Sequence, residues 1–133
     1  MQLNPYLNFD GTTREAMEFY QKVLGGALDV QTFGDSPMEA SAEDKDRVMH
    51  ARLDADGFTI MASDFQSGAT DTGGENVSLS LQGTDLVALS GIFDGLADGG
   101  EVTMPMAEQF WGDTFGMLTD RYGIHWMVNV LKG

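Results

Sequence analysis

Few side chains in this 133-residue chain could carry out chemistry. The chain has no cysteine, which excludes disulfides, thiolate catalysis and cysteine-ligated metals. Its two histidines, His50 and His125, have no third ligand at a zinc-binding spacing, and we interpret both as structural. Ser78 and Ser80 have no general base at a motif spacing, so they favour hydrogen bonding to a ligand over nucleophilic catalysis.

An internal repeat indicates how these side chains are positioned. When the sequence is shifted by 66 residues, residues 54–63 fall on residues 120–129, and a turn aspartate, a turn glycine, the apolar positions and a methionine coincide. Nearer the N-terminus the shift is 74 residues, and Gly25-Gly26 falls on Gly99-Gly100. Such a repeat predicts two similar modules, with a site between them.

The hydrophobic pattern predicts one strand, one helix and three further strands in each module. We expect one domain, 1–133, with modules at 1–66 and 75–133. Thr12 and Glu15 have the spacing of a capping box at the start of the first helix. The first module is expected to have strands at 2–9, 28–33, 47–54 and 58–64, and a helix between Thr12 and Gly25. The second is expected to have strands at 76–82 and 101–106, a helix at 86–96, and a hairpin with its turn at 120–123.

The predicted fold is α+β, because two βαβββ modules can form one cupped, mixed eight-stranded sheet with the helices outside. The cup is the expected ligand cavity. Strand alternation places Met61 and Met127 toward the cup and predicts that Trp126 belongs to the core. Trp111 is expected in a glycine-rich strand, and the sequence leaves open whether it lines the bottom of the pocket or packs between the two modules. The residues expected toward the cup are Thr59, Met61, Ser63, His125, Met127 and Asn129, and those expected against the helices are Ile60, Ala62, Trp126 and Val128.

The net charge of −14 excludes some partners. Residues 1–67 and residues 68–133 each contribute −7, so the charge is spread evenly. Such a field repels nucleic acids and anionic membranes, and we interpret it as an adaptation to solubility or to a saline habitat. The sequence shows no signal peptide and no membrane span, so we expect a cytoplasmic protein.

Short motifs recur along nearly the whole chain. They are Pro5-Tyr6-Leu7-x-Phe9, Glu18-Phe19-Tyr20, Met49-His50-Ala51, Met61-Ala62-Ser63-Asp64, Asn76-x-Ser78-Leu79-Ser80-Leu81, Phe110-Trp111-Gly112, Phe115-Gly116-Met117-Leu118-Thr119-Asp120 and Gly123-x-x-Trp126-Met127-Val128-Asn129. Together with the βαβββ duplication, these motifs resemble the PhnB-like branch of the vicinal-oxygen-chelate superfamily, which includes glyoxalase, bleomycin-resistance and extradiol-dioxygenase proteins. This branch is sometimes labelled a demethylubiquinone methyltransferase, but no glycine-rich loop for S-adenosylmethionine joins the first strand to the helix.

The resemblance also implies where a metal would be bound. Members that catalyse reactions hold one divalent metal, with His, Gln or Glu ligands on the first and last strand of each module. The corresponding residues here are Asn4, Met61, Asn76 and Met127, which provide no anionic ligand. A methionine pair could bind Cu(I), but we interpret these methionines as adaptable apolar contacts and expect no metal or other cofactor.

The sequence therefore favours a metal-free protein that binds a small apolar or aromatic molecule, and it leaves catalysis open. One alternative is a metal-dependent lyase, isomerase or dioxygenase with unusual ligands. Another is a bleomycin-type resistance protein, for which an acidic surface would attract a cationic glycopeptide. The resemblance implies a homodimer. The predicted ligand-binding residues are Tyr6, Asn8, Met61, Asn76, Ser78, Trp111, His125 and Met127.

Overall fold

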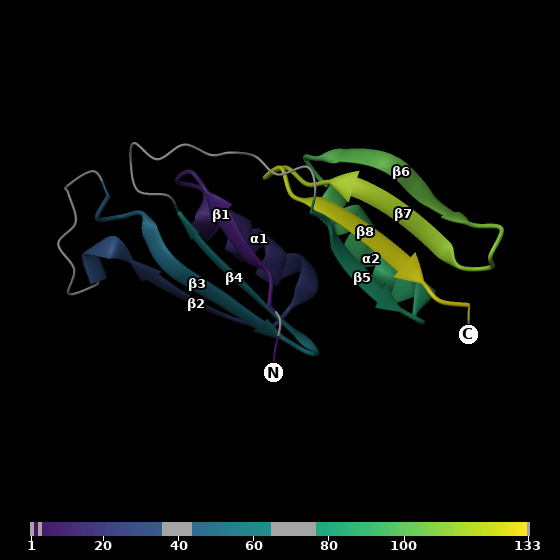
Figure 1. Ribbon diagram of the computed structural model, residues 1–133, viewed down its shortest axis with the longest axis horizontal. Helices are drawn as coiled ribbons and strands as arrows, with labels where there is room; N and C mark the ends of the chain where they lie inside the picture. Colours follow the sequence, from purple (N-terminus) through teal and green to yellow (C-terminus); the bar gives the residue numbers. More distant parts are fainter. Residues whose placement is uncertain (1, 3, 36–43, 65–76, 133) are drawn as a thin grey trace. The chain divides into compact units, whose positions relative to one another are not determined.

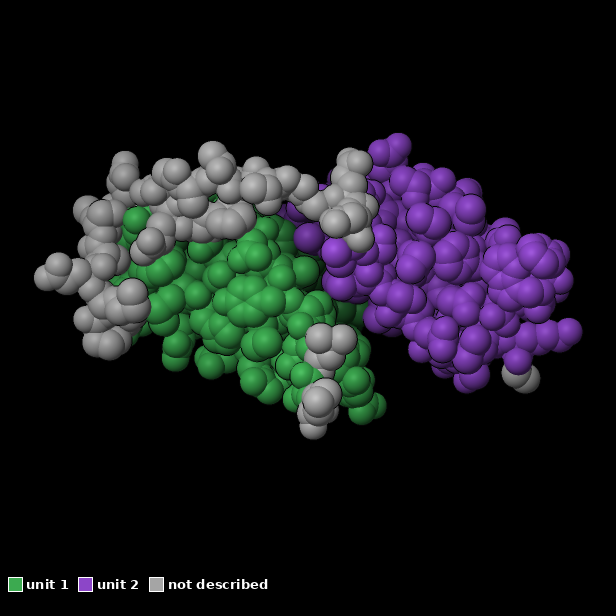
Figure 2. All heavy atoms as spheres, in the orientation of Figure 1, with its two compact units in different colours: residues 1–73 green, residues 74–133 purple. Residues whose placement is uncertain are grey.

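The computed structural model describes residues 2, 4–35, 44–64 and 77–132, and the chain divides into two compact units, residues 1–73 and 74–133 (Figures 1 and 2). No helix in the described part of the chain is long and apolar enough to cross a membrane. Unit 1 contains β1 (Tyr6–Phe9), α1 (Thr13–Leu24), β2 (Ala27–Thr32), a short 3-10 helix η1 (Phe33–Asp35), β3 (Val48–Ala55) and β4 (Phe58–Asp64). Unit 2 contains β5 (Leu79–Gly83), α2 (Leu86–Ala97), β6 (Glu101–Glu108), β7 (Thr114–Thr119) and β8 (His125–Val130).

Each unit forms its own four-stranded mixed sheet, and the two sheets have the same topology. The strand order is β1-β4-β3-β2 in sheet A and β5-β8-β7-β6 in sheet B. In both sheets the first strand pairs in parallel with the last, and the other pairs are antiparallel. The predicted βαβββ repeat is thereby confirmed. The joining of the two sheets into one cup stays a prediction.

The helices cover one face of each sheet, as the alternation of apolar residues predicts. In unit 1, Met17 and Tyr20 of α1 are buried together with Leu53 and Ile60 of the sheet. In unit 2, Phe93 of α2 is buried, and its ring occupies the space where a side chain at Gly116 of β7 would lie. The predicted assignment of Ile60, Ala62, Trp126 and Val128 to the cores is confirmed, since all four are buried.

Close backbone contact explains the paired glycines that follow each helix. A Cβ atom added to Gly26 would lie 2.4 Å from the carbonyl oxygen of Asp54, and one added to Gly100 would lie 2.3 Å from that of Thr119. Both contacts are far too short for any side chain. The chain leaving each helix therefore packs directly on the end of the neighbouring hairpin strand, and only glycine fits at that point.

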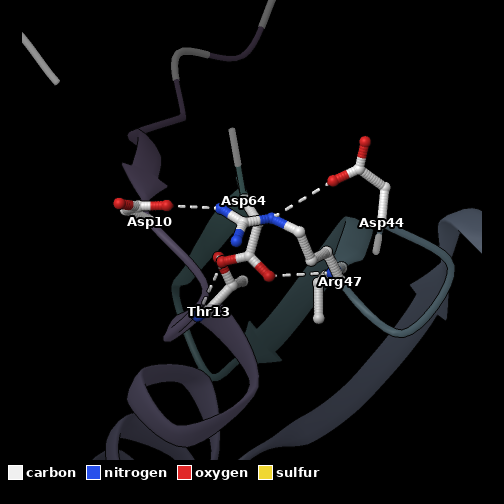
Figure 3. Close-up of polar contacts among 6 residues, drawn as sticks. Asp10, Thr13, Asp44, Arg47 and Asp64 are labelled. Atoms are coloured by element: carbon white, nitrogen blue, oxygen red, sulfur yellow. Dashed lines mark hydrogen bonds and ion pairs between the residues drawn. The ribbon is translucent and has the colours of Figure 1, made fainter. Parts of the chain in front are cut away.

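Helix α1 begins differently from the sequence prediction. Thr12 makes no side-chain hydrogen bond to the helix, so the predicted capping box is wrong. Instead the buried carboxylate of Asp64, at the end of β4, accepts hydrogen bonds from the Thr13 backbone N–H at 3.0 Å and from Thr13 Oγ1 at 2.6 Å. The other carboxylate oxygen of Asp64 accepts a hydrogen bond from the Val48 N–H at 2.8 Å. At the same end of the sheet, Arg47 forms ion pairs with Asp10 and Asp44 (Figure 3). Asp64 thus joins α1, β3 and β4.

A second buried carboxylate organises the turn before β8. Asp120 accepts hydrogen bonds from the backbone N–H groups of Tyr122 and Ile124, at 2.8 and 3.1 Å, and from Nε1 of Trp126 at 2.8 Å. Trp126 is only 2% exposed, so its indole N–H needs such a partner. The prediction that Trp126 belongs to the core is confirmed.

Candidate functional site

Each sheet has a second face that turns away from its helix, which we call the helix-free face. Its side chains are partly or fully exposed along most of each strand, whereas the strand residues of the hydrophobic core, including Leu53, Ile60 and Val128, lie on the opposite face. The helix-free face of sheet A carries Tyr6, Asn8, His50, Arg52, Thr59, Met61 and Ser63. The helix-free face of sheet B carries Ser80, Gln82, Met104, Phe115, Met117, Thr119, His125, Met127 and Asn129.

Tyr6 lies on the edge strand β1 and contacts other residues of the helix-free face of sheet A. It is the register partner of Met61 on the neighbouring strand β4. Its hydroxyl lies 3.4 Å from Nδ1 of His50 on β3, and the two ring centroids are 6.0 Å apart. Because the Tyr6 side chain is 44% exposed, this face offers a phenol, an imidazole and a thioether to a ligand.

Three methionines form a row across the helix-free face of sheet B. Met127 of β8 is the register partner of Met117 of β7, which is the partner of Met104 of β6. Register partners on adjacent strands have Cβ atoms roughly 4.5–5.5 Å apart, so the three thioether side chains are neighbours. Met106, by contrast, lies on the helix side, where its Sδ lies close to Gly116. The row from Met104 to Met127 is a deformable apolar surface.

Polar groups lie on β8 on both sides of Met127, the last methionine of this row. On one side, Thr119 Oγ1 lies 2.9 Å from Nδ1 of His125, so this contact orients the ring and leaves Nε2 as its other polar atom. On the other side, the amide nitrogen of Asn129 donates to Oδ2 of Asp113 at 3.2 Å. The strand therefore presents an imidazole, a thioether and an amide in succession at His125, Met127 and Asn129.

Asp113 holds the turn between β6 and β7 against the end of β8. The Lys132 backbone N–H donates to its carboxylate at 3.0 Å. This bond, followed by those from the side chains of Asn129 and Trp111, holds the pKa of Asp113 below its ordinary value, against an opposing contribution from desolvation. Asp113 is thus an ionised acceptor near neutral pH, and it can only accept from Asn129.

An aromatic group lies at the same end of sheet B. Trp111 meets Phe110 edge-on with ring centroids 4.9 Å apart, and it lies 6.4 Å from Phe115. Phe110 is 97% exposed and Trp111 is 50% exposed. Trp111 belongs to the turn between β6 and β7, not to a strand as the sequence suggested, because Gly112 adopts a positive φ of 100° and closes a turn onto Gln109.

The predicted site residues fall into two groups, one in each unit. Tyr6, Asn8 and Met61 share the helix-free face of sheet A, where Asn8 is the register partner of Ser63. His125 and Met127 share the helix-free face of sheet B, and Ser78 is exposed immediately before β5. Trp111 lies at the turn, and Asn76 falls outside the described residues. Their convergence in one cup stays a prediction.

The residues at the family's metal positions do not fit a divalent cation. The shared register of the two sheets makes Ser80 the counterpart of Tyr6, so Ser78 rather than Asn76 is the counterpart of Asn4. With Met61 and Met127, these positions offer an amide, a hydroxyl and two thioethers, and none is anionic. No group of three or more His, Asp or Glu side chains within the described ranges could hold a metal.

Sequence reasoning missed several residues of the helix-free face of sheet B. Met117 and Phe115 alternate along β7 just as His125 and Met127 do along β8, so strand alternation could have found them. Asn129 was expected toward the cup but was not included among the ligand-binding residues. No sequence signal reveals that Asp113 binds Asn129, because the pairing depends on how the turn packs against β8.

Comparisons with known proteins place the chain in a family. A family model described as 3-demethylubiquinone-9 3-methyltransferase matches residues 1–129. Protein YjdN of Escherichia coli (strain K12) is 35% identical over 144 residues, which cover 99% of this chain and 97% of that protein. The crystal structure of protein PA1353 from Pseudomonas aeruginosa is 42% identical with a TM-score of 0.90, covering 100% of this chain and 99% of that chain.

Two more distant structures share the fold. A PhnB protein from Bacillus cereus is 23% identical with a TM-score of 0.80, covering 98% of this chain and 100% of that chain. A glyoxylase/bleomycin resistance protein/dioxygenase domain from Frankia sp. EAN1pec is 17% identical with a TM-score of 0.70, covering 99% of this chain and 98% of that chain. The chain therefore belongs to the 3-demethylubiquinone-9 3-methyltransferase family, and it shares its fold with a PhnB protein and with a glyoxylase/bleomycin resistance protein/dioxygenase domain.

Proposed function

We propose that this protein binds a small apolar or aromatic molecule on the helix-free faces of its sheets, without a divalent metal. The observation that carries the proposal is the row of Met104, Met117 and Met127 across three adjacent strands of sheet B. A sheet face left uncovered by its helix and lined with thioethers favours contact with apolar groups of varied shape. The nearby imidazole of His125 and the amide of Asn129 add the few oriented polar groups that small-molecule sites usually contain.

Methyl transfer, which the family description names, has less support from the residues. The connection between β1 and α1 consists of Asp10, Gly11 and Thr12, with a single glycine. A side chain at Gly11 would lie 3.3 Å from the Arg47 guanidinium, so this short connection is already packed. It does not resemble the glycine-rich loop with which doubly wound sheets bind nucleotide cofactors.

Thermal unfolding in the presence of a panel of small aromatic and aliphatic molecules tests the proposal. A molecule that binds the native state must raise the melting temperature in a concentration-dependent way. The variant that tests the site is Met117→Lys, which places a charged ammonium group in the methionine row. An apolar ligand bound there would have to desolvate this charge, which is unfavourable. Stabilisation of the wild type that is lost in this variant supports the site. A panel in which no compound stabilises the wild type overturns the proposal.

Elemental analysis of the purified protein tests the metal-free part of the proposal. The expected result is no stoichiometric zinc, nickel, manganese or iron, because Met61 and Met127 provide thioethers where a divalent cation needs anionic or imidazole ligands. Near-stoichiometric metal after purification without added metal would instead favour a metal-dependent lyase, isomerase or dioxygenase of the superfamily.

The net charge of −14 supports a second candidate, the binding of a cationic glycopeptide such as bleomycin. A negative field raises the local concentration of cationic ligands and speeds their association, and added salt weakens the effect. Calorimetric titration with bleomycin at low and high salt distinguishes this candidate. Tight, salt-sensitive binding would favour it, and absence of binding would remove it.

A further inference from the structure

Asn129 has a buried side-chain oxygen for which the structure provides no partner. Its Oδ1 makes no hydrogen bond to any described residue, although solvent does not reach it. A buried acceptor without a donor is costly, and native structures contain few of them. This oxygen is therefore a candidate for contact with a molecule other than the protein itself.

The hydrogen-bonding partner of Asn129 determines which end of its amide faces Asp113. The two ends of an amide are hard to tell apart by shape, and the hydrogen-bond network must assign them. Here the amide faces the carboxylate of Asp113, which also accepts the Lys132 N–H, and an ionised carboxylate cannot donate. The NH₂ group of Asn129 must therefore point to Asp113, and Oδ1 is left to accept from elsewhere.

The neighbours of Asn129 indicate the rest of the ligand. Its register partners are Phe115 on β7 and Gln82 on β5, and Met127 is the next residue on the same face of β8. Phe115 in turn contacts the Trp111 ring. Aromatic rings and methionine sulfurs both favour contact with another ring. Because solvent does not reach Oδ1, a ligand contacts it only after neighbouring side chains move, and the side chain of Met127 is conformationally adaptable.

We propose that the helix-free face of sheet B selects aromatic molecules that carry an N–H or O–H donor, and that Asn129 Oδ1 accepts this donor. The inference rests on the proposed function, since it names the chemical class that the face binds. Asp113 acts as a positioning residue, because it holds the amide so that oxygen rather than nitrogen is available.

Pairs of probe molecules that differ only in the donor test the inference. Phenol is compared with anisole, and indole with 1-methylindole, by calorimetric titration at millimolar concentration. The wild type should prefer phenol and indole by roughly tenfold, as expected for one hydrogen bond to a buried acceptor. Asn129→Leu removes the acceptor and should bind both members of each pair with similar affinity.

Two further variants separate orientation from loss of structure. Asp113→Asn can donate as well as accept, so the Asn129 amide is free to turn over and the donor preference should be lost although Asn129 is intact. Gln21→Leu replaces an amide on α1, away from both helix-free faces, and it should keep the preference. Because the readout is a ratio within one variant, reduced stability does not imitate the effect.

Two outcomes overturn the inference. One is equal binding of donor and methylated probes by the wild type, which shows that Oδ1 does not meet the ligand but leaves apolar binding in place. The other is a preference that survives in Asn129→Leu. Failure of all four probes to bind also overturns it, and the broader thermal panel then decides the proposed function separately.

Discussion

At the level of single residues, each unit contains a buried aspartate that accepts hydrogen bonds from several neighbours. The carboxylates of Asp64 and Asp120 accept hydrogen bonds from backbone N–H groups, and also from the Thr13 hydroxyl and the Trp126 indole. A carboxylate suits this role because it offers acceptor sites on two oxygens and cannot compete as a donor. Asp64 is 5% exposed and Asp120 is 3% exposed, so both carboxylates make these contacts away from solvent.

Replacing Asp64 should therefore destabilise the protein strongly. In Asp64→Asn, one oxygen is replaced by an NH₂ group that faces either the Thr13 or the Val48 N–H, so a buried donor loses its partner. We expect a loss of about 2–4 kcal/mol in the free energy of unfolding, measured by urea denaturation. The matched control is Asp85→Asn at the exposed N-terminus of α2, where asparagine caps equally well and the change should stay within about 0.5 kcal/mol. Equal effects of the two variants would contradict the role assigned to Asp64.

Asp113 predicts a pH dependence of stability. Its pKa lies below the ordinary value of 3.8, chiefly because of the Lys132 N–H, so the folded state favours the ionised carboxylate. The contribution of Asp113 to stability is therefore fully present above about pH 4–5 and is lost as the pH falls through the folded-state pKa. Urea midpoints of the wild type and Asp113→Asn should differ by a constant amount near neutral pH and converge in acid. A difference that grows on acidification would rule this out.

At the scale of elements, the local sequence predicted most strands and helices, and the errors arose where a residue's role depends on contacts distant in the sequence. Periodicity and the repeat predicted the eight strands and both helices, because most of these elements have one apolar face. The start of α1 was predicted wrongly because its cap comes from Asp64, 51 residues along the chain. Trp111 was assigned to a strand because the turn conformation of Gly112 is not visible in the pattern. The role of Asn129 depends on Asp113, and no spacing rule connects the two.

Because of how α2 packs against β7, replacing two glycines by alanine should change stability in opposite directions. A Cβ atom at Gly116 would lie 2.8 Å from the Phe93 ring and 2.9 Å from Sδ of Met106, so Gly116→Ala should lose about 1–3 kcal/mol of stability. Gly91, within α2, has no such neighbour within 4 Å, and Gly91→Ala should gain about 0.5–1 kcal/mol through helix propensity. Thermal and urea unfolding measure both changes. Destabilisation by Gly91→Ala would show that α2 packs more closely than described.

For the whole molecule, rebuilding a metal site tests whether the two units share one cup. In the combined variant, Met61→Glu and Met127→Glu add carboxylates, and Asn4→His and Ser78→His add imidazoles at the positions that the shared register makes equivalent. Two carboxylates and two imidazoles suit a divalent cation. We expect an apoprotein that is less stable than the wild type and regains melting temperature with zinc or nickel. A folded variant that does not respond to metal would show that these four positions do not converge.

Assembly is the second prediction at this scale. We expect a homodimer, because β6 is an edge strand exposed along most of its length and such edges are usually covered. Analytical ultracentrifugation at micromolar concentration should give about twice the chain mass of 14.4 kDa. A single species of the chain mass would contradict the expectation.

The distant cap of α1 has a consequence for the order in which the chain folds. Helix α2 carries its own cap, since Asp85 accepts the Ala88 N–H at 3.1 Å, so its first turn can form from neighbouring residues alone. The first turn of α1 is completed only when the end of β4 arrives beside it. During refolding, the amide hydrogen of Ala88 should therefore become protected from exchange earlier than that of Thr13. Protection of the Thr13 amide would then follow the docking of the β3–β4 hairpin. The time at which this amide becomes protected therefore reports when α1 and the hairpin pack together.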